Sequence, residues 1–220
     1  MDDTTEIFDF LKKPLRLLAN YFHQHAPFAI KAMEAGMDVI SECTAAGTMK
    51  ECVDLVRCVE RTGRKYMIAE NYPFSTSNLE MKHQIDSGTL GTLLYAEGEY
   101  NHPLPLNESL WYAPGLRHWR NWLPDCYYIT HALAPLMYIT GTLPAEVSCS
   151  LIPVAANVPP EHNLHRPGFA MLLRMDNGAI FRIYSGVSGH SCWYGLHGTH
   201  GAMEVGRGAG YFGKETVRIW

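Results

Sequence analysis

The hydrophobic and polar positions follow two different periods along the chain. In the first part, short apolar runs alternate with segments of helical period. An apolar run at residues 15–19 precedes a helix-period segment at 27–36, and a second apolar run follows at 39–40. Strand, helix and strand in this order predict a βαβ unit with parallel strands.

The same pattern continues beyond that unit. Thr48 and Glu51 have the spacing of a capping box before a helical segment that ends at Gly63. A third short strand is expected at residues 66–69. A third helix is expected from Ser77, and it ends near residue 88.

Glu80 stands three residues after Ser77 and predicts a second capping box there. Residues 1–90 therefore have the pattern of a partial doubly wound, Rossmann-like parallel sheet of α/β class.

From residue 92 the period becomes that of a half-buried strand, because residues 92–100 alternate almost strictly. Helical spacing returns at 128–140 and ends at Gly141. Asp176-Asn177-Gly178 is a strong hairpin signal. Residues 91–220 thus predict an α+β domain with a large, mostly antiparallel open sheet, whose later strands are expected at 145–151, 169–175, 179–184, 193–197, 202–205 and 216–220.

Composition and charge exclude several classes of function. The chain has 220 residues, of which 47% are hydrophobic and 18% charged, with a net charge of −4. Without a basic run, neither a nucleic acid nor a membrane surface is an expected partner. The six scattered cysteines form no C-x-x-C pair and predict free thiols in a reducing cytoplasm. No apolar signal-peptide core is present near Met1.

Polar residues follow the predicted parallel strands where such sheets bind ligands, beyond their carboxyl ends. Asn20 follows the first strand, Glu42 and Thr44 follow the second, and Asn71 follows the third. The alternative is a solvated or helix-capping carboxylate at Glu42 and ordinary turn asparagines at the other two positions. His25 is expected to cap or pack on the same side, and no metal site is predicted.

His131 is the candidate proton-transfer residue. Histidine exchanges protons near neutral pH, so it can serve as a general acid or base. Tyr127 precedes it by one helical turn in the expected helix, so both side chains would lie on one face. The alternatives are a core histidine and a packing tyrosine.

A long connection rich in proline and aromatic residues spans residues 101–124. Loops of this length are usually functional. His102, Trp119 and Arg120, together with Tyr128, have the chemistry of a sugar pocket, since aromatic faces stack on sugars and arginine binds hydroxyls or carboxylates. A small satellite core beneath the loop is the alternative.

Several motifs together resemble the glucose–fructose oxidoreductase / inositol dehydrogenase / MocA family. From His25 the chain reads H-A-x-x-A-x-x-A-x-x-A-G-x-x-V-x-x-E to Glu42. The resemblance continues through G-T-L-G-T-L at 88–93, Glu-Tyr-Asn-His at 99–102, His131 and the G-x-x-P at 141–144. It covers nearly the whole chain.

The resemblance implies bound NAD or NADP, a sugar, polyol or sugar-derived substrate, and a homodimer or homotetramer formed through the open sheet. The candidate cofactor-binding residues are Asn20, His25, Glu42, Thr44 and Asn71, although the family more often has other residues at positions 20 and 71. The candidate acid/base residues are His131 with Tyr127, and the candidate substrate-binding residues are His102, Trp119, Arg120 and Tyr128.

Departures from the family pattern qualify that assignment. Cys43 stands in place of the lysine of the family's E-K-P, and Tyr127 in place of the aspartate of its D-x-x-x-H. No G-x-G-x-x-G opens a helix after a strand, and residues 206–213 are expected to form turns instead. The family's first strands and phosphate loop would precede Met1, and the C-terminal domain is expected to be truncated.

Two further functions stay open at the level of sequence. One is an NAD-dependent glycosidase that works by transient oxidation and elimination. The other is a non-catalytic sugar-binding or oligomerisation fragment, because the missing phosphate loop normally supplies most of the pyrophosphate recognition.

Overall fold

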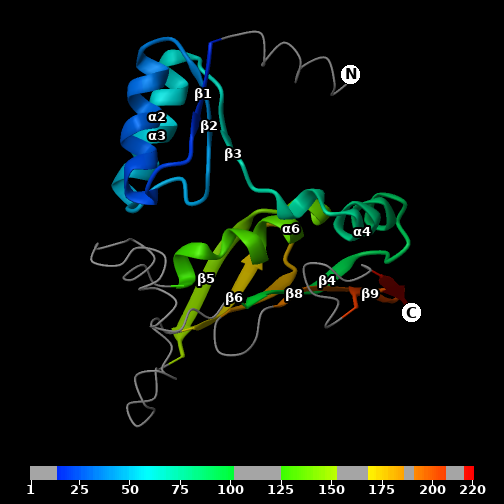
Figure 1. Cartoon of the computed structure of the whole chain (residues 1–220). Helices are drawn as coiled ribbons and strands as arrows, with labels where there is room; N and C mark the ends of the chain where they lie inside the picture. Colours follow the sequence, from blue (N-terminus) through cyan, green and yellow to red (C-terminus); the bar gives the residue numbers. More distant parts are fainter. Residues whose placement is uncertain (1–13, 102–124, 153–167, 186–190, 207–215) are drawn as a thin grey trace. The chain divides into compact units, whose positions relative to one another are not determined.

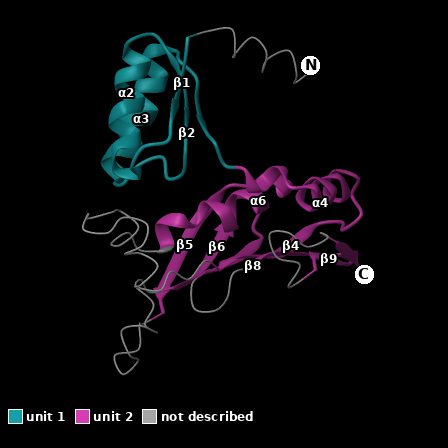
Figure 2. Ribbon diagram, viewed as in Figure 1, with its two compact units in different colours: residues 1–70 teal, residues 71–220 magenta. Residues whose placement is uncertain are grey.

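A computed structural model describes residues 14–101, 125–152, 168–185, 191–206 and 216–220 (Figure 1). The chain divides into two compact units, residues 1–70 and 71–220 (Figure 2). Each unit is described by itself. Within the described ranges, no helix is both long and apolar enough to cross a lipid bilayer.

Unit 1 contains a three-stranded parallel sheet. Its strands are β1 (Leu15–Leu18), β2 (Asp38–Ser41) and β3 (Tyr66–Ile68), in the order β1-β2-β3. Short apolar runs separated by helical segments favour this parallel arrangement, because each crossover needs a helix. The predicted βαβ organisation is confirmed.

Helices α2 (His25–Glu34) and α3 (Met49–Thr62) lie on one side of these strands (Figure 1), and a short 3₁₀ turn, η1 (Phe22–Gln24), leads into α2. The helices and strands share one core, formed by Leu18, Ala29, Ala32, Met33, Val39, Leu55 and Cys58. The predicted capping box of α3 is present, because Thr48 Oγ1 accepts the Glu51 N–H while the Glu51 carboxylate accepts the Thr48 N–H.

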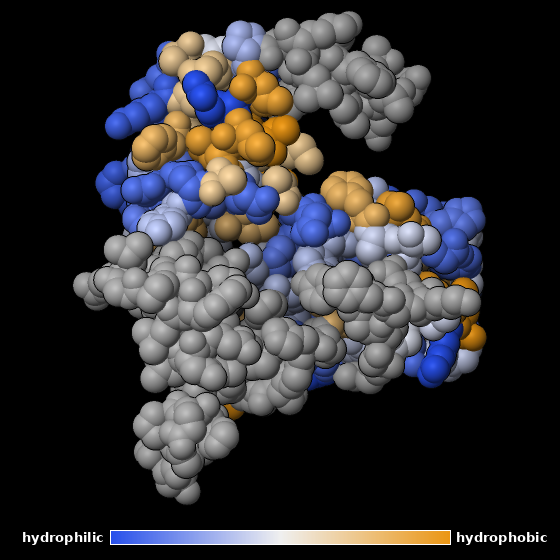
Figure 3. All heavy atoms as spheres, in the orientation of Figure 1, coloured by the Kyte–Doolittle hydropathy of each residue, from blue (hydrophilic) through white to orange (hydrophobic). Residues whose placement is uncertain are grey.

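The opposite face of this sheet carries an apolar row. Leu17, Ile40 and Met67 are register neighbours across the three strands, and they alternate with residues that face the helices. Leu17 is 65% exposed and Met67 46%. Apolar atoms gather over the strands of unit 1 in Figure 3. In the described part of the chain, β1 pairs on only one side.

Unit 2 is built on a seven-stranded sheet of order β10-β9-β8-β4-β7-β6-β5. All its neighbouring strands are antiparallel except β4 and β7. The predicted mostly antiparallel open sheet is therefore confirmed. Its strands are β4 (Leu93–Asn101), β5 (Pro144–Leu151), β6 (Phe169–Met175), β7 (Ile180–Ser185), β8 (Ser191–Gly198), β9 (Ala202–Val205) and β10 (Val217–Ile219).

Helices α4 (Thr76–Asp86) and α6 (Thr130–Thr140) cover one face of this sheet (Figure 1), with the 3₁₀ turns η2 (Tyr72–Phe74) and η4 (Asp125–Tyr128). Helix α6 approaches β4 very closely at Gly98. A Cβ at Gly98 would collide with the carbonyl oxygen of Ala132. The core of unit 2 lies between α6 and the sheet and includes Leu136, Ile139, Phe181, Ile183 and Leu196.

The start of α4 differs from the sequence-based expectation. Ser75 is its N-cap and accepts the N–H of Asn78, so the predicted capping box at Ser77 and Glu80 is wrong. Helix α4 also packs against α6 in unit 2. The compact units therefore divide earlier than the expected boundary near residue 90, and the functional division into nucleotide-binding and substrate domains stays a prediction.

We expect Gly98→Ala to lower the free energy of unfolding by about 3 kcal/mol or more, because the new methyl group meets backbone that cannot rotate away. Chemical denaturation measures this effect. Gly141→Ala is the control: Gly141 has open space and φ +67°, so only the left-handed backbone is penalised, by about 1–2 kcal/mol. Equal losses in the two variants would contradict the close approach.

Candidate functional site

A buried histidine joins the two loops at the carboxyl ends of β1 and β2. His25 Nδ1 lies 2.8 Å from the carbonyl oxygen of Thr44, and its Nε2 lies 2.9 Å from the carbonyl oxygen of Asn20. Only 1% of His25 is exposed. The structure thus brings together three residues that the sequence predicts to bind a cofactor. The imidazole contacts the main-chain carbonyl oxygens of the other two residues and not their side chains.

The side chains at this edge differ in their surroundings. Asn20 Nδ2 donates to Gln24 at 3.2 Å, while the buried Asn20 Oδ1 has no hydrogen-bond partner among the described residues. Glu42 is exposed, and its N–H donates to the carbonyl of Leu18. A buried acceptor without a donor fits a ligand that carries hydroxyl or amide N–H groups, as a nicotinamide dinucleotide does.

The cysteine that stands at the family's lysine position has a polar partner. Cys43 Sγ donates to Glu70 Oε2 at 3.2 Å, which links the residues that follow β2 and β3. Sequence reasoning did not select Glu70, although its place after an apolar strand is the same signal that pointed to Glu42. This pair supplies a carboxylate and a neutral thiol, and it contains no cation.

His131 in unit 2 lies among three tyrosine rings. The centroid distances from the imidazole are 4.6 Å to Tyr72, 4.7 Å to Tyr100 and 4.7 Å to Tyr128. His131 is 8% exposed. We call these four residues the tyrosine cage. It restricts the imidazole to one region and places phenol groups beside it.

The cage only partly matches the predicted residues. Tyr128, expected to bind substrate, contacts His131. Tyr127 lies in the 3₁₀ turn η4 and not in α6, which begins at Thr130, so the expected spacing of one α-helical turn between Tyr127 and His131 is wrong. The tighter 3₁₀ turn changes the direction of the preceding side chains.

The remaining predicted residues are spread more widely. Asn71 is exposed and precedes η2 at the start of unit 2. His102, Trp119 and Arg120 lie outside the described residues. Sequence reasoning missed Tyr72, and it left open which face of the sheet Tyr100 occupies. Tyr100 lies on the same face of β4 as Ala96, a core residue. Strand alternation could therefore have predicted that Tyr100 faces the core.

A cluster of charged side chains lies on the face of the large sheet opposite to Tyr100. The Arg182 guanidinium binds Glu97 through Nε at 2.9 Å and through Nη2, and it reaches Glu99 at 3.2 Å. Desolvation lowers the pKa of Arg182, but the hydrogen bond and charge of Glu97, with help from Glu99, outweigh it and raise the pKa overall. Burial raises the pKa of Tyr95 beside this group, with Glu97 adding to the effect.

Burial also raises the pKa of Tyr66 in unit 1, and the nearby Ser41 side chain partly offsets this effect. Neutral tyrosine is therefore favoured at both positions, and neither phenol is a ready base. The groups suited to proton exchange near neutral pH are the histidines.

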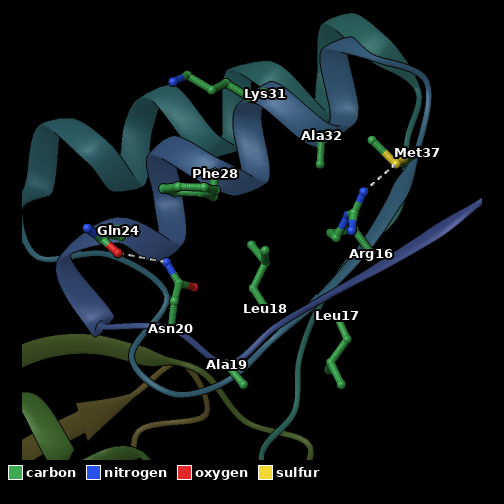
Figure 4. A pocket seen from close by; sticks show the side chains of 10 residues that line it. All are labelled: Arg16, Leu17, Leu18, Ala19, Asn20, Gln24, Phe28, Lys31, Ala32 and Met37. Carbon is green, nitrogen blue, oxygen red and sulfur yellow. Dashed lines mark hydrogen bonds between the residues drawn. The ribbon is translucent and has the colours of Figure 1, made fainter.

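The described part of unit 1 has a cavity of about 510 Å³ between β1 and α2 (Figure 4). Leu18, Phe28 and Ala32 line it, with Arg16 and Lys31 among its polar residues. Residues of β1 and α2 form most of its lining, and Ala19, Asn20 and Gln24 lie beyond the carboxyl end of β1. We interpret it as the side of an edge strand, where apolar surface is left between strand and helix.

The fold combines part of a parallel doubly wound sheet with an open sheet backed by helices. No protein-family model matches the chain. The chain is 30% identical over 128 residues to glycosyl hydrolase family 109 protein 1 of Shewanella sp. (strain ANA-3), a match that covers 54% of this chain and 27% of the relative.

Two solved structures share the fold. The aldose-aldose oxidoreductase of Caulobacter crescentus, complexed with glycerol, matches 99% of this chain and 63% of its own with a TM-score of 0.72 and 19% identity. An NAD binding oxidoreductase of Klebsiella pneumoniae gives the same coverage with a TM-score of 0.70 and 19% identity. At this level of identity the two structures show a shared fold. The chain spans 63% of each of these structures and 27% of the curated relative.

We expect His25→Leu to destabilise unit 1, because a loop carbonyl loses the imidazole N–H that hydrogen-bonds to it. An unsatisfied buried acceptor costs about 1–3 kcal/mol. Urea unfolding measures the loss. The matched control is His23→Leu, since His23 is exposed in η1 and its replacement should change the free energy of unfolding by about 0.5 kcal/mol or less. Similar effects in both variants would contradict the bridging role.

Proposed function

We propose that this chain is part of an NAD(P)-dependent oxidoreductase that acts on a sugar, polyol or sugar-derived substrate. The observation that carries the proposal is His131 within the tyrosine cage, in a fold shared with an aldose-aldose oxidoreductase and an NAD binding oxidoreductase. Unit 1 would hold the cofactor, and unit 2 would supply the proton transfer.

Asn20, Glu42 and Thr44 would hold the cofactor at the carboxyl ends of β1 and β2, supported by His25 and joined by Asn71. When bound, a nicotinamide ring supplies the acceptor or donor of a hydride. The orphan acceptor Asn20 Oδ1 would take a hydrogen bond from a cofactor hydroxyl or amide. Glu42 would accept from a ribose hydroxyl.

His131 would be the general acid/base. In the oxidation of an alcohol, it takes the hydroxyl proton while the carbinol C–H bond breaks and the carbonyl forms; in reduction it returns that proton. Neutral imidazole suits the first role and imidazolium the second. Tyr127 would assist His131 in acid/base catalysis, and Tyr128, with His102, Trp119 and Arg120, would bind the carbohydrate.

An NAD-dependent glycosidase is the second candidate, and the observation that favours it is the similarity to proteins named glycosyl hydrolase family 109. Such an enzyme would release the aglycone without net NADH. The absence of net NADH would distinguish it from the dehydrogenase, and solvent deuterium next to the transiently oxidised carbon of the product would distinguish it from hydrolysis by paired carboxylates. A cytoplasmic homodimer or homotetramer formed through the open sheet is part of the proposal for either enzyme.

Cofactor binding is the first test. NAD and NADP are titrated by calorimetry into this chain and into a chain extended upstream of Met1. Binding by either polypeptide supports the proposal, and binding by neither overturns it in favour of a non-catalytic sugar-binding or oligomerisation fragment.

We expect His131→Asn to lower turnover by about 10²–10⁴-fold, because the proton-transfer group is lost, while the dissociation constant of the cofactor stays unchanged. Stopped-flow absorbance of NAD(P)H and calorimetry measure the two quantities in the cofactor-binding polypeptide. The control is His83→Gln, since His83 is exposed on α4. An unchanged turnover in His131→Asn would remove His131 from the chemistry.

A further inference from the structure

Helix α6 contains a proline one turn after the candidate catalytic residue. Pro135 follows His131 by four positions and lies inside the helix. In an α-helix the carbonyl of residue i accepts the N–H of residue i+4, and proline has no N–H. The carbonyl of His131 therefore lacks its ordinary helical donor.

A side chain from the sheet replaces that donor. The hydroxyl of Tyr194, on β8, donates to the carbonyl oxygen of His131 at 2.6 Å in a buried environment. Tyr194 is 4% exposed and belongs to the core of unit 2. The bond joins the backbone at the candidate base to a rigid strand.

The register places this bond where the helix meets the sheet. Tyr194 lies opposite Gly98 on the neighbouring strand β4. Gly98 is the position that admits the Ala132 carbonyl. Two adjacent strands thus fix two consecutive residues of α6, His131 and Ala132, through one hydrogen bond and one close approach.

We infer that Tyr194 is a positioning residue for His131, and that Pro135 creates the need for it. This inference rests on the proposed function for its catalytic consequence. Tyr194 bonds to the main chain, so it holds the turn from which the imidazole projects and takes no proton in the reaction. It sets where the imidazole lies relative to the rings of the tyrosine cage.

The experiment is a double-mutant cycle of Tyr194→Phe and Pro135→Ala. Tyr194→Phe keeps the ring in the core and removes only the hydroxyl. Pro135→Ala restores an N–H that can bond to the His131 carbonyl. If Tyr194 acts by supplying the missing donor, its hydroxyl matters while Pro135 is present and matters much less in the Pro135→Ala background.

The first readout is the NMR signal of the His131 ring C–H in histidine-labelled protein, assigned by its loss in His131→Asn. Ring currents of the three tyrosines make this signal sensitive to the imidazole position. We expect Tyr194→Phe to move it at constant pH, and the double variant to match Pro135→Ala alone. Tyr138→Phe is the control, because Tyr138 is on the same helix and 37% exposed.

The second readout is the folding equilibrium from urea unfolding. Tyr194→Phe should lower the folded-to-unfolded ratio about fivefold with Pro135 present, as expected for one net hydrogen bond, and by clearly less in the Pro135→Ala background. This readout also detects any variant that fails to fold. Equal losses in both backgrounds, with no movement of the His131 signal, would overturn the inference.

Turnover separates this inference from the proposed function. In an active polypeptide, Tyr194→Phe should lower kcat by about tenfold or more, since displaced catalytic groups lose much of their effect, and Pro135→Ala should restore it. Absence of activity in every variant, with the NMR and folding cycles as expected, would refute the proposed function and leave the positioning role standing. Full activity of Tyr194→Phe in the Pro135 background would refute the positioning role.

Discussion

The contact of α6 with the large sheet is the constraint on which unit 2 depends. The helix can approach β4 only because position 98 has no side chain, since any Cβ there would meet the Ala132 carbonyl. That short distance brings His131 within reach of Tyr100 from the sheet and Tyr72 from η2. A larger residue at position 98 would move α6 away from β4 and separate the histidine from Tyr100. The core and the candidate site therefore depend on the same contact.

Features set by local sequence could be predicted well, and features set by distant neighbours could not. The capping box at Thr48 and the left-handed end of α6 at Gly141 follow from a few adjacent residues, and both are present. Sequence order alone places helix α4 with the first domain, because its neighbours along the chain belong there, yet the helix packs on α6. Chain order carries no information about which core a connecting helix will join.

The candidate site shows the same division. The strand-end rule selected Asn20, Glu42 and Thr44 as candidates from their positions alone, and His25 joins the loops of two of them. Tyr72 and Tyr194 gave no such signal, because each reaches His131 from an element remote in sequence. A proline four residues after a candidate histidine was visible in the sequence. What replaces its missing N–H became visible only once the strand order placed β8 beside β4.

The bridge made by His25 also constrains what the loops of unit 1 can do. Both of its partners are carbonyl oxygens, so the bridge does not use the side chains of Asn20 and Thr44. Any residue at those positions would provide the same acceptors, and the bridge by itself gives no reason for an asparagine at position 20. The buried oxygen of that asparagine has no donor among the described residues, and leaving it so carries a desolvation penalty. A ligand that donates to it would remove the penalty, which makes Asn20 Oδ1 the strongest structural argument for a bound cofactor in unit 1.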